Sequence, residues 1–151
     1  MFKVQVSETI TCKVEVPVKA DNGAEERRVY YAEFTRLTRE QIKAVSNNMM
    51  YRKLDDDALD ELVEKGSLTE AELAALKAEK PLTDEEVVRR YMVGWKEVAD
   101  HDGQPLPFNE HTRDQVMNIW PTLPCTVNAF FQAHEAPELK NSRTLRGIGR
   151  K

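Results

Sequence analysis

Four side chains that could bind a metal ion or transfer protons lie close together in the stretch "DHDGQPLPFNEH". They are Asp100, His101, Asp102 and His111. In an EF-hand loop that begins at Asp100, Pro105 would stand where a Gly is required and His111 where a bidentate Glu is required. The register therefore argues against calcium binding of this type.

Zinc binding and nucleophilic catalysis also match the sequence poorly. His101 and His111 are ten residues apart, no Cys lies near either, and a catalytic zinc needs a third protein ligand. A nucleophilic pair of Cys125 and His134 would be separated by about 13 Å on one straight helix, at about 1.5 Å per residue. The glycines form no phosphate-binding loop pattern. We therefore expect no catalytic residues, no metal site and no cofactor, and a protein that is not an enzyme.

A tight turn explains the same stretch more simply. Asp102 and Gly103 favour a chain reversal, because both residue types suit turn conformations. The following "PLPF" runs extended, because each Pro disfavours helix in the residue before it. We predict a small hairpin or extended pair between two helices, clamped by apolar side chains from its two arms. These side chains are Trp95, Val98, Leu106 and Phe108.

An antiparallel β-hairpin is predicted ahead of these elements. Apolar residues recur at every second position from Cys12 to Val18, which is the pattern of a half-buried strand. Pro17 has no N–H to donate, so this strand is expected at a sheet edge or bulged at Pro17. Asn22-Gly23 is a strong hairpin signal, and "RRVYYAEF" supplies the return strand.

Helical patterns replace the β pattern from Leu37 onward. Capping boxes are predicted at Thr38–Gln41, Thr69–Glu72 and Thr83–Glu86, and a further cap at Thr112–Gln115. Apolar spacing in "TDEEVVRRYMVGW" predicts one helix that continues to its final Trp. The expected fold class is α+β: an N-terminal antiparallel β-hairpin or small sheet, followed by a bundle of short helices with a small Trp-containing turn inserted.

Composition indicates one globular domain over residues 1–138 and a basic, flexible tail over residues 139–151. The whole chain has 151 residues and a formal net charge of −4, which does not favour nucleic-acid binding. Residues 54–87 hold 12 acidic and 3 basic residues, a net charge of 3 − 12 = −9. No apolar run reaches about 18 residues, and the N-terminus alternates polar and apolar residues, so neither a membrane span nor a secretory signal is expected. Cys12 and Cys125 are expected to be reduced thiols.

The residues around the turn resemble tail assembly chaperones of long-tailed bacteriophages and prophages. The resemblance is carried by "GWKEV", "DG" and "PLPF", followed by a short helix with paired aromatic residues and a basic tail, and it covers about residues 86–140. It implies a non-enzymatic protein in the cytoplasm of the bacterial host cell. Such a chaperone binds the tape measure protein during tail morphogenesis, and the tail tube protein is a further possible partner. The family supplies no fixed set of binding residues to transfer.

An assembly chaperone needs apolar surface that can shield a partner, and Met adapts well to varied partners. The candidate contacts are Met49, Met50, Tyr51, Phe130 and Phe131, with packing in the protein core as the alternative for each. A small structural, tube-associated tail protein and a weakly nucleic-acid-binding regulator that uses the basic tail are the alternative functions. Self-association remains open.

Overall fold

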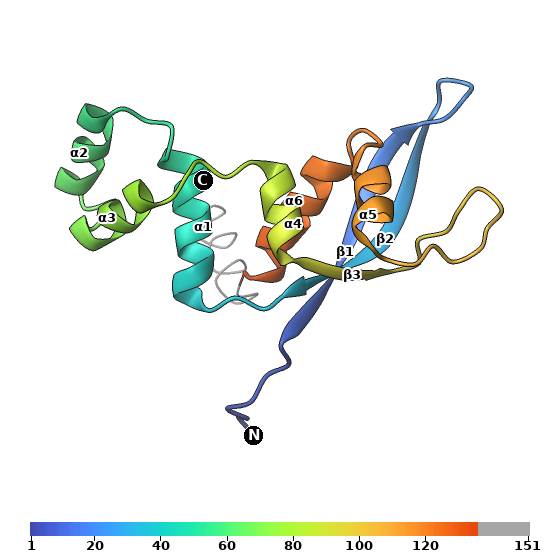
Figure 1. Ribbon diagram of the computed structural model, residues 1–151, viewed down its shortest axis with the longest axis horizontal. Helices are drawn as coiled ribbons and strands as arrows, with labels where there is room; N and C mark the ends of the chain where they lie inside the picture. Colours follow the sequence, from blue (N-terminus) through green and yellow to red (C-terminus); the bar gives the residue numbers. More distant parts are fainter. Residues whose placement is uncertain (136–151) are drawn as a thin grey trace, which may run out of the picture. The chain divides into compact units, whose positions relative to one another are not determined.

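The computed structural model describes residues 1–135, and the expected basic tail at 139–151 lies outside the described residues. Its contacts divide the chain into two compact units (Figure 1). The sheet unit combines residues 1–36 with the chain from Tyr91 onward, and the helical unit is residues 37–90. The α+β fold class is confirmed. One domain over 1–138 was the expectation, and this division was not anticipated, because periodicity does not tell which elements share a core.

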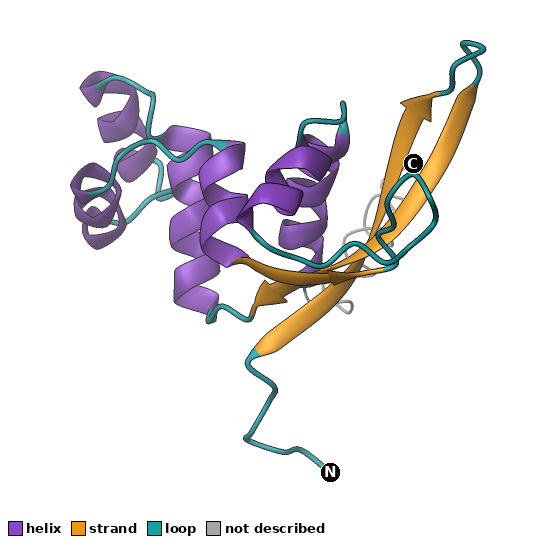
Figure 2. Ribbon diagram, turned by 45° about the vertical axis from the view of Figure 1, so that its right-hand side comes forward, coloured by secondary structure: helices purple, strands orange, loops and turns teal. Residues whose placement is uncertain are grey.

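Three antiparallel strands form the sheet in the order β1-β2-β3, as Figure 2 shows in orange. They are β1 (Thr9–Lys19), β2 (Glu25–Thr35) and β3 (Met92–Lys96). The predicted β1–β2 hairpin is confirmed, and its turn contains Gly23 at a φ of 82°. Of the two alternatives for Pro17, the edge strand is confirmed, because within residues 1–135 β1 pairs only with β2.

Strand β3 corrects the prediction of a helix that runs through Trp95. The helix α4 (Asp84–Tyr91) stops earlier, and the chain continues as the strand beside β2. Gly94 explains the change, because Gly is a poor helix former and lets β3 approach its neighbour closely. A Cβ atom at this position would lie 3.1 Å from a carboxylate oxygen of Glu33 on β2.

Helix α6 (Thr122–Ala133) packs on the sheet and closes the core of the sheet unit. The buried apolar residues of this unit are Val14, Val16, Tyr30, Ala32, Phe34, Met92, Val127, Ala129 and Phe130. The Tyr30 hydroxyl hydrogen-bonds the hydroxyl of Thr126, which also donates to the Thr122 carbonyl at 2.8 Å. Burial raises the pKa of Tyr30 to about 12, so this core phenol stays neutral at physiological pH.

The cap predicted at Thr112–Gln115 is wrong by one turn. Helix α5 (Glu110–Met117) begins after Asn109, whose side chain accepts from the Thr112 N–H at 2.9 Å. The Thr112 hydroxyl accepts in return from the Asn109 N–H at 3.0 Å. Thr112 is therefore the third residue of the helix in this capping box, and Asn109 is the N-cap. Asn is the stronger N-cap residue, and it stands three positions earlier.

The helical unit contains α1 (Arg39–Tyr51), α2 (Asp56–Glu64), α3 (Glu70–Ala78) and most of α4. The predicted capping boxes of α1 and α3 are confirmed. At the start of α4, the Glu86 N–H donates to the Thr83 hydroxyl at 3.3 Å. Leu59, Leu68 and Leu76 form a small core, and other apolar side chains pack around it. These are Tyr51, Leu62, Val63 and Leu73.

Asn48 fastens the segment after α3 onto α1. Its buried amide donates to the Lys80 carbonyl at 2.9 Å and accepts from the Leu82 N–H at 2.8 Å. We expect Asn48→Ala to lower the free energy of unfolding by about 1–3 kcal/mol, because two backbone groups lose their partners. Chemical denaturation followed by circular dichroism measures this loss. Ser46→Ala, on a half-buried position of the same helix, is the control, and an equal loss there would contradict the assignment.

Candidate functional site

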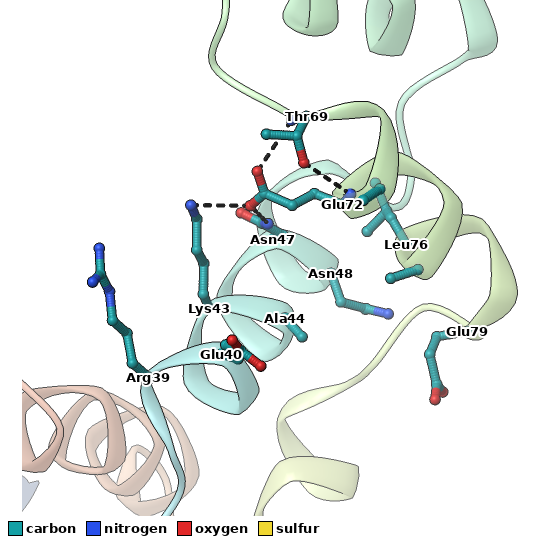
Figure 3. Close-up of a pocket in the computed structure, with 12 residues that line it drawn as sticks. Arg39, Glu40, Lys43, Ala44, Asn47, Asn48, Thr69, Glu72, Leu76 and Glu79 are labelled. Carbon is teal, nitrogen blue, oxygen red and sulfur yellow. Dashed lines mark hydrogen bonds and ion pairs between the residues drawn. The ribbon is translucent and has the colours of Figure 1, made fainter.

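A pocket of about 540 Å³ lies between α1 and α3 within the helical unit (Figure 3). Small and apolar side chains form part of its lining, and polar or charged side chains form the rest. The first group is Ala44, Ala71, Ala75 and Leu76, and the second is Arg39, Glu40, Lys43, Asn47, Asn48, Thr69, Glu72 and Glu79. We call this the α1–α3 pocket. Its volume suits a few large side chains of a partner or a small ligand.

Glu72 is the most constrained charged residue of the α1–α3 pocket. One carboxylate oxygen accepts from the Thr69 N–H at 3.1 Å and completes the capping box. The other lies 3.1 Å from the Lys43 ammonium and accepts from the Asn47 amide at 3.2 Å, as the dashed lines in Figure 3 show. Lys43 first, and then the Thr69 N–H, lower the pKa of Glu72 from 4.5 to about 2. The carboxylate is therefore ionised throughout the physiological range and holds α1 against α3.

This lowered pKa predicts how the stability of the helical unit depends on pH. The folded state holds the Glu72 proton less tightly than the unfolded state, so the contribution is fully present above about pH 4.5. It is lost as the pH falls toward about 2. We expect the free energy of unfolding of wild type to exceed that of Glu72→Gln at pH 7. This difference should disappear as the pH falls from about 4.5 toward about 2. Urea denaturation at a series of pH values measures it.

Glu70→Gln is the control for this titration, because Glu70 is exposed in the same first turn of α3. At pH 7, the free energy of unfolding of Glu70→Gln should differ from that of wild type by less than that of Glu72→Gln does. A Glu72→Gln difference that persists unchanged at pH 2 would contradict the role of the carboxylate charge.

The exposed alanines give the α1–α3 pocket a second property. Ala44 on α1 and Ala71 and Ala75 on α3 are exposed, so short side chains cover this part of the two helices. Arg39 and Glu40 stand at the start of α1, beside this surface. A helix or extended segment can approach short side chains closely, while the charges around them form ion pairs at its flanks.

The Trp-containing turn is formed by contacts between its two arms. The Trp95 indole N–H donates to the Leu106 carbonyl at 2.8 Å, and its ring meets Phe108 edge-to-face at 5.1 Å between centroids. The Leu106 N–H donates to the Val98 carbonyl at 2.8 Å. Gly103 takes a φ of 80°, which only Gly adopts readily. Trp95, Val98, Leu106 and Phe108 are each half-buried, so the turn is a packed element.

Asp100 directs the reversal, whereas the prediction named only Asp102 and Gly103 for this role. Its carboxylate accepts from the Asp102 N–H and the Gln104 N–H, each at 2.9 Å. In the sequence, this role is indicated by an Asp two residues before the turn, because its side chain can accept hydrogen bonds from the backbone of the turn. Within residues 1–135, no three metal-ligating side chains gather at one place. In the turn, His101 Nε2 lies 3.4 Å from a carboxylate oxygen of Asp102, and both side chains are exposed.

No protein-family model matches this chain, and no curated protein or solved structure is similar to it. In the described part of the chain, no helix is long and apolar enough to cross a bilayer.

The five candidate contact residues belong to both units and differ in exposure. Met50 is 58% exposed on α1, whereas Met49 is half-buried and Tyr51 packs on the leucine core. The structure does not support Phe130 as a partner contact, because this residue is fully buried and presents no surface to a partner. Phe131 is half-buried and meets the Phe130 ring edge-to-face at 5.2 Å. None of the five residues lines the α1–α3 pocket. The periodicity of the sequence could not reveal this pocket, because the pocket arises from packing between two helices.

Cys125 and His134 do not meet as a nucleophilic pair. They stand near opposite ends of α6, where His134 Nδ1 lies 2.9 Å from the Phe130 carbonyl. Burial raises the pKa of the Cys125 thiol, which lowers the reactive thiolate fraction. Both Cys12 and Cys125 are free thiols and half-buried.

Proposed function

We propose that this protein is a non-enzymatic tail assembly chaperone that binds the phage tape measure protein in the cytoplasm of the bacterial host. The α1–α3 pocket is the proposed binding site for a helical segment of that partner. The observation that carries the proposal is the combination of exposed alanines with a charged surround in one pocket. The resemblance of residues 86–140 to such chaperones supports the choice of partner.

The charges of the helical unit indicate which segment would bind. Lys43 is already paired with Glu72, and the remaining charged residues of the pocket are two exposed carboxylates, Glu40 and Glu79, and one exposed guanidinium, Arg39. The unit is strongly acidic over residues 54–87, with 12 acidic and 3 basic residues. Opposite charge steers association and selects the orientation of a partner. The preferred segment is therefore an amphipathic helix with an apolar face and Lys or Arg at its flanks.

Co-expression with the tape measure protein of the same phage tests this function. We expect the soluble fraction of the tape measure protein to rise when this chain is present, and the two proteins to co-purify through a tag on either one. Unchanged solubility together with no co-purification would require the chaperone proposal to be abandoned.

A small structural, tube-associated tail protein is the second candidate function. It is favoured by exposed apolar residues ahead of β1, since Phe2, Val4 and Val6 extend from the sheet unit. The oligomeric state separates the two functions. A stable ring or stacked polymer of the isolated protein would favour the structural role, whereas a monomer or closed dimer fits the chaperone.

A further inference from the structure

Residues 1–8 form an exposed arm ahead of β1, outside any helix or strand. Phe2, Val4 and Val6 are 91%, 91% and 64% exposed. Their alternation places these three side chains on one face when the arm is extended. Soluble proteins rarely leave such an apolar face uncovered, and its usual meaning is an interaction surface.

A groove of about 170 Å³ lies elsewhere on the same unit, where the apolar face of the β1–β2 hairpin continues past the start of α6. Most of its lining residues are aliphatic, and the charged Arg28 and Glu97 stand among them. The aliphatic ones are Val16, Val18, Val29, Val98, Ala99, Val116 and Ile119. An apolar cavity of about 150 Å³ is large enough to bind benzene. The groove therefore has room for one phenyl ring. The groove is open to solvent, since Ile119 in its lining is 43% exposed.

To reach its own groove, the arm of a chain would have to reverse completely and run back along β1 at nearly full extension. Phe2 stands seven residues before Thr9 and reaches at most about 25 Å from it when fully extended. Val16 and Val18 of the groove stand seven and nine residues after Thr9 along β1, which is about 23 and 30 Å at roughly 3.3 Å per residue. The arm would also have to reverse its direction at once, which shortens its reach further.

Arg36 opposes such a reversal. Its guanidinium Nε–H donates to the Ser7 carbonyl at 2.8 Å, and its backbone N–H donates to the Glu8 carbonyl at 2.8 Å. These two bonds hold the base of the arm beside the end of β2. In both ribbon views the arm leaves the sheet at the end opposite to the hairpin tip (Figures 1 and 2). The arm is thus directed away from its own groove and into reach of another molecule.

We propose that the arm of one copy binds in the groove of a second copy, with Phe2 between Val18 and Ile119. Val4 and Val6 then cover the apolar side chains next to the groove. Each copy carries both an arm and a groove, so two copies can exchange arms and close a symmetric dimer. This contact lies in the sheet unit and uses no residue of the α1–α3 pocket, so it can fail while the proposed chaperone function stands.

The test uses the full chain and measures mass against concentration by light scattering after size exclusion. Wild type should self-associate, and Phe2→Ser and Ile119→Arg should each weaken association by roughly tenfold or more, because each removes buried apolar contact. Lys3→Ser is the matched arm control and should behave as wild type. An equimolar mixture of the two defective variants should associate more tightly than either alone, because it restores one arm in one intact groove.

The proposal is overturned if wild type stays monomeric at every concentration, if Phe2→Ser or Ile119→Arg associates as wild type does, or if the mixture shows no recovery. Circular dichroism verifies that each variant is folded. Phe2 lies outside the folded core, so the arm variant remains informative even if Ile119→Arg destabilises the sheet unit.

Discussion

Replacing Phe130 by Ala is expected to lower the free energy of unfolding of the sheet unit by about 3–5 kcal/mol. Phe130 is fully buried and lies at the centre of the aromatic cluster of this unit. Its ring stacks on Tyr91 at 5.3 Å and meets Phe34 edge-to-face at 5.4 Å between centroids. The variant leaves a cavity that β2, β3 and α6 cannot close without repacking, which is why the expected loss is large.

Phe131→Ala is the matched control, because Phe131 is the next residue of α6 and only half-buried. Its loss should be clearly smaller. Both Trp residues of the chain, Trp95 and Trp120, belong to the sheet unit, so Trp fluorescence during urea denaturation reports on this unit. Equal losses in the two variants would show that Phe130 is not the centre of the core.

Ala75→Arg is expected to abolish the binding of the tape measure protein that we propose. Ala75 lies on α3, is exposed and lines the α1–α3 pocket, so a long charged side chain there fills the space reserved for the partner. It also adds positive charge where a basic segment should bind. Arg is nearly as good a helix former as Ala, so α3 itself should be little affected. Co-purification with the tagged tape measure protein measures the loss.

Ala74→Arg is the control that distinguishes binding in the pocket from binding on the neighbouring surface of α3. Ala74 is the preceding residue of α3 and is also exposed, but it does not line the α1–α3 pocket. The two variants therefore have the same composition and charge. Binding that is retained by Ala74→Arg and lost by Ala75→Arg supports the pocket as the binding site. Equal loss in both, or in neither, would assign binding to another surface.

Local signals predicted the hairpin and most helix starts, because their causes lie within a few residues. Asn22-Gly23 fixes the turn, and the boxes Thr38–Gln41 and Thr69–Glu72 both form. Strand β3 could not be predicted in this way. Its apolar spacing suits a helix, and only the free edge of β2 and the small Gly94 make a strand the better solution. Tertiary pairing here overrides local periodicity.

The candidate site was harder to predict than the fold. Apolar residue type pointed to Phe130, but a large aromatic side chain on an amphipathic helix serves the core as readily as a surface. The α1–α3 pocket depends on contacts between residues far apart in sequence, such as Asn47 with Glu72. The sequence did mark Glu72 as a capping residue, but it did not show that the same carboxylate also pairs with Lys43.

Hydrogen–deuterium exchange of the protein, free and in complex with the tape measure protein, tests the central claim most directly. We predict that binding slows exchange in residues 39–51 and 69–79, the helices that line the α1–α3 pocket, and leaves the β1–β2 hairpin unchanged. Slower exchange confined to the sheet unit, or no complex at all, would contradict the account.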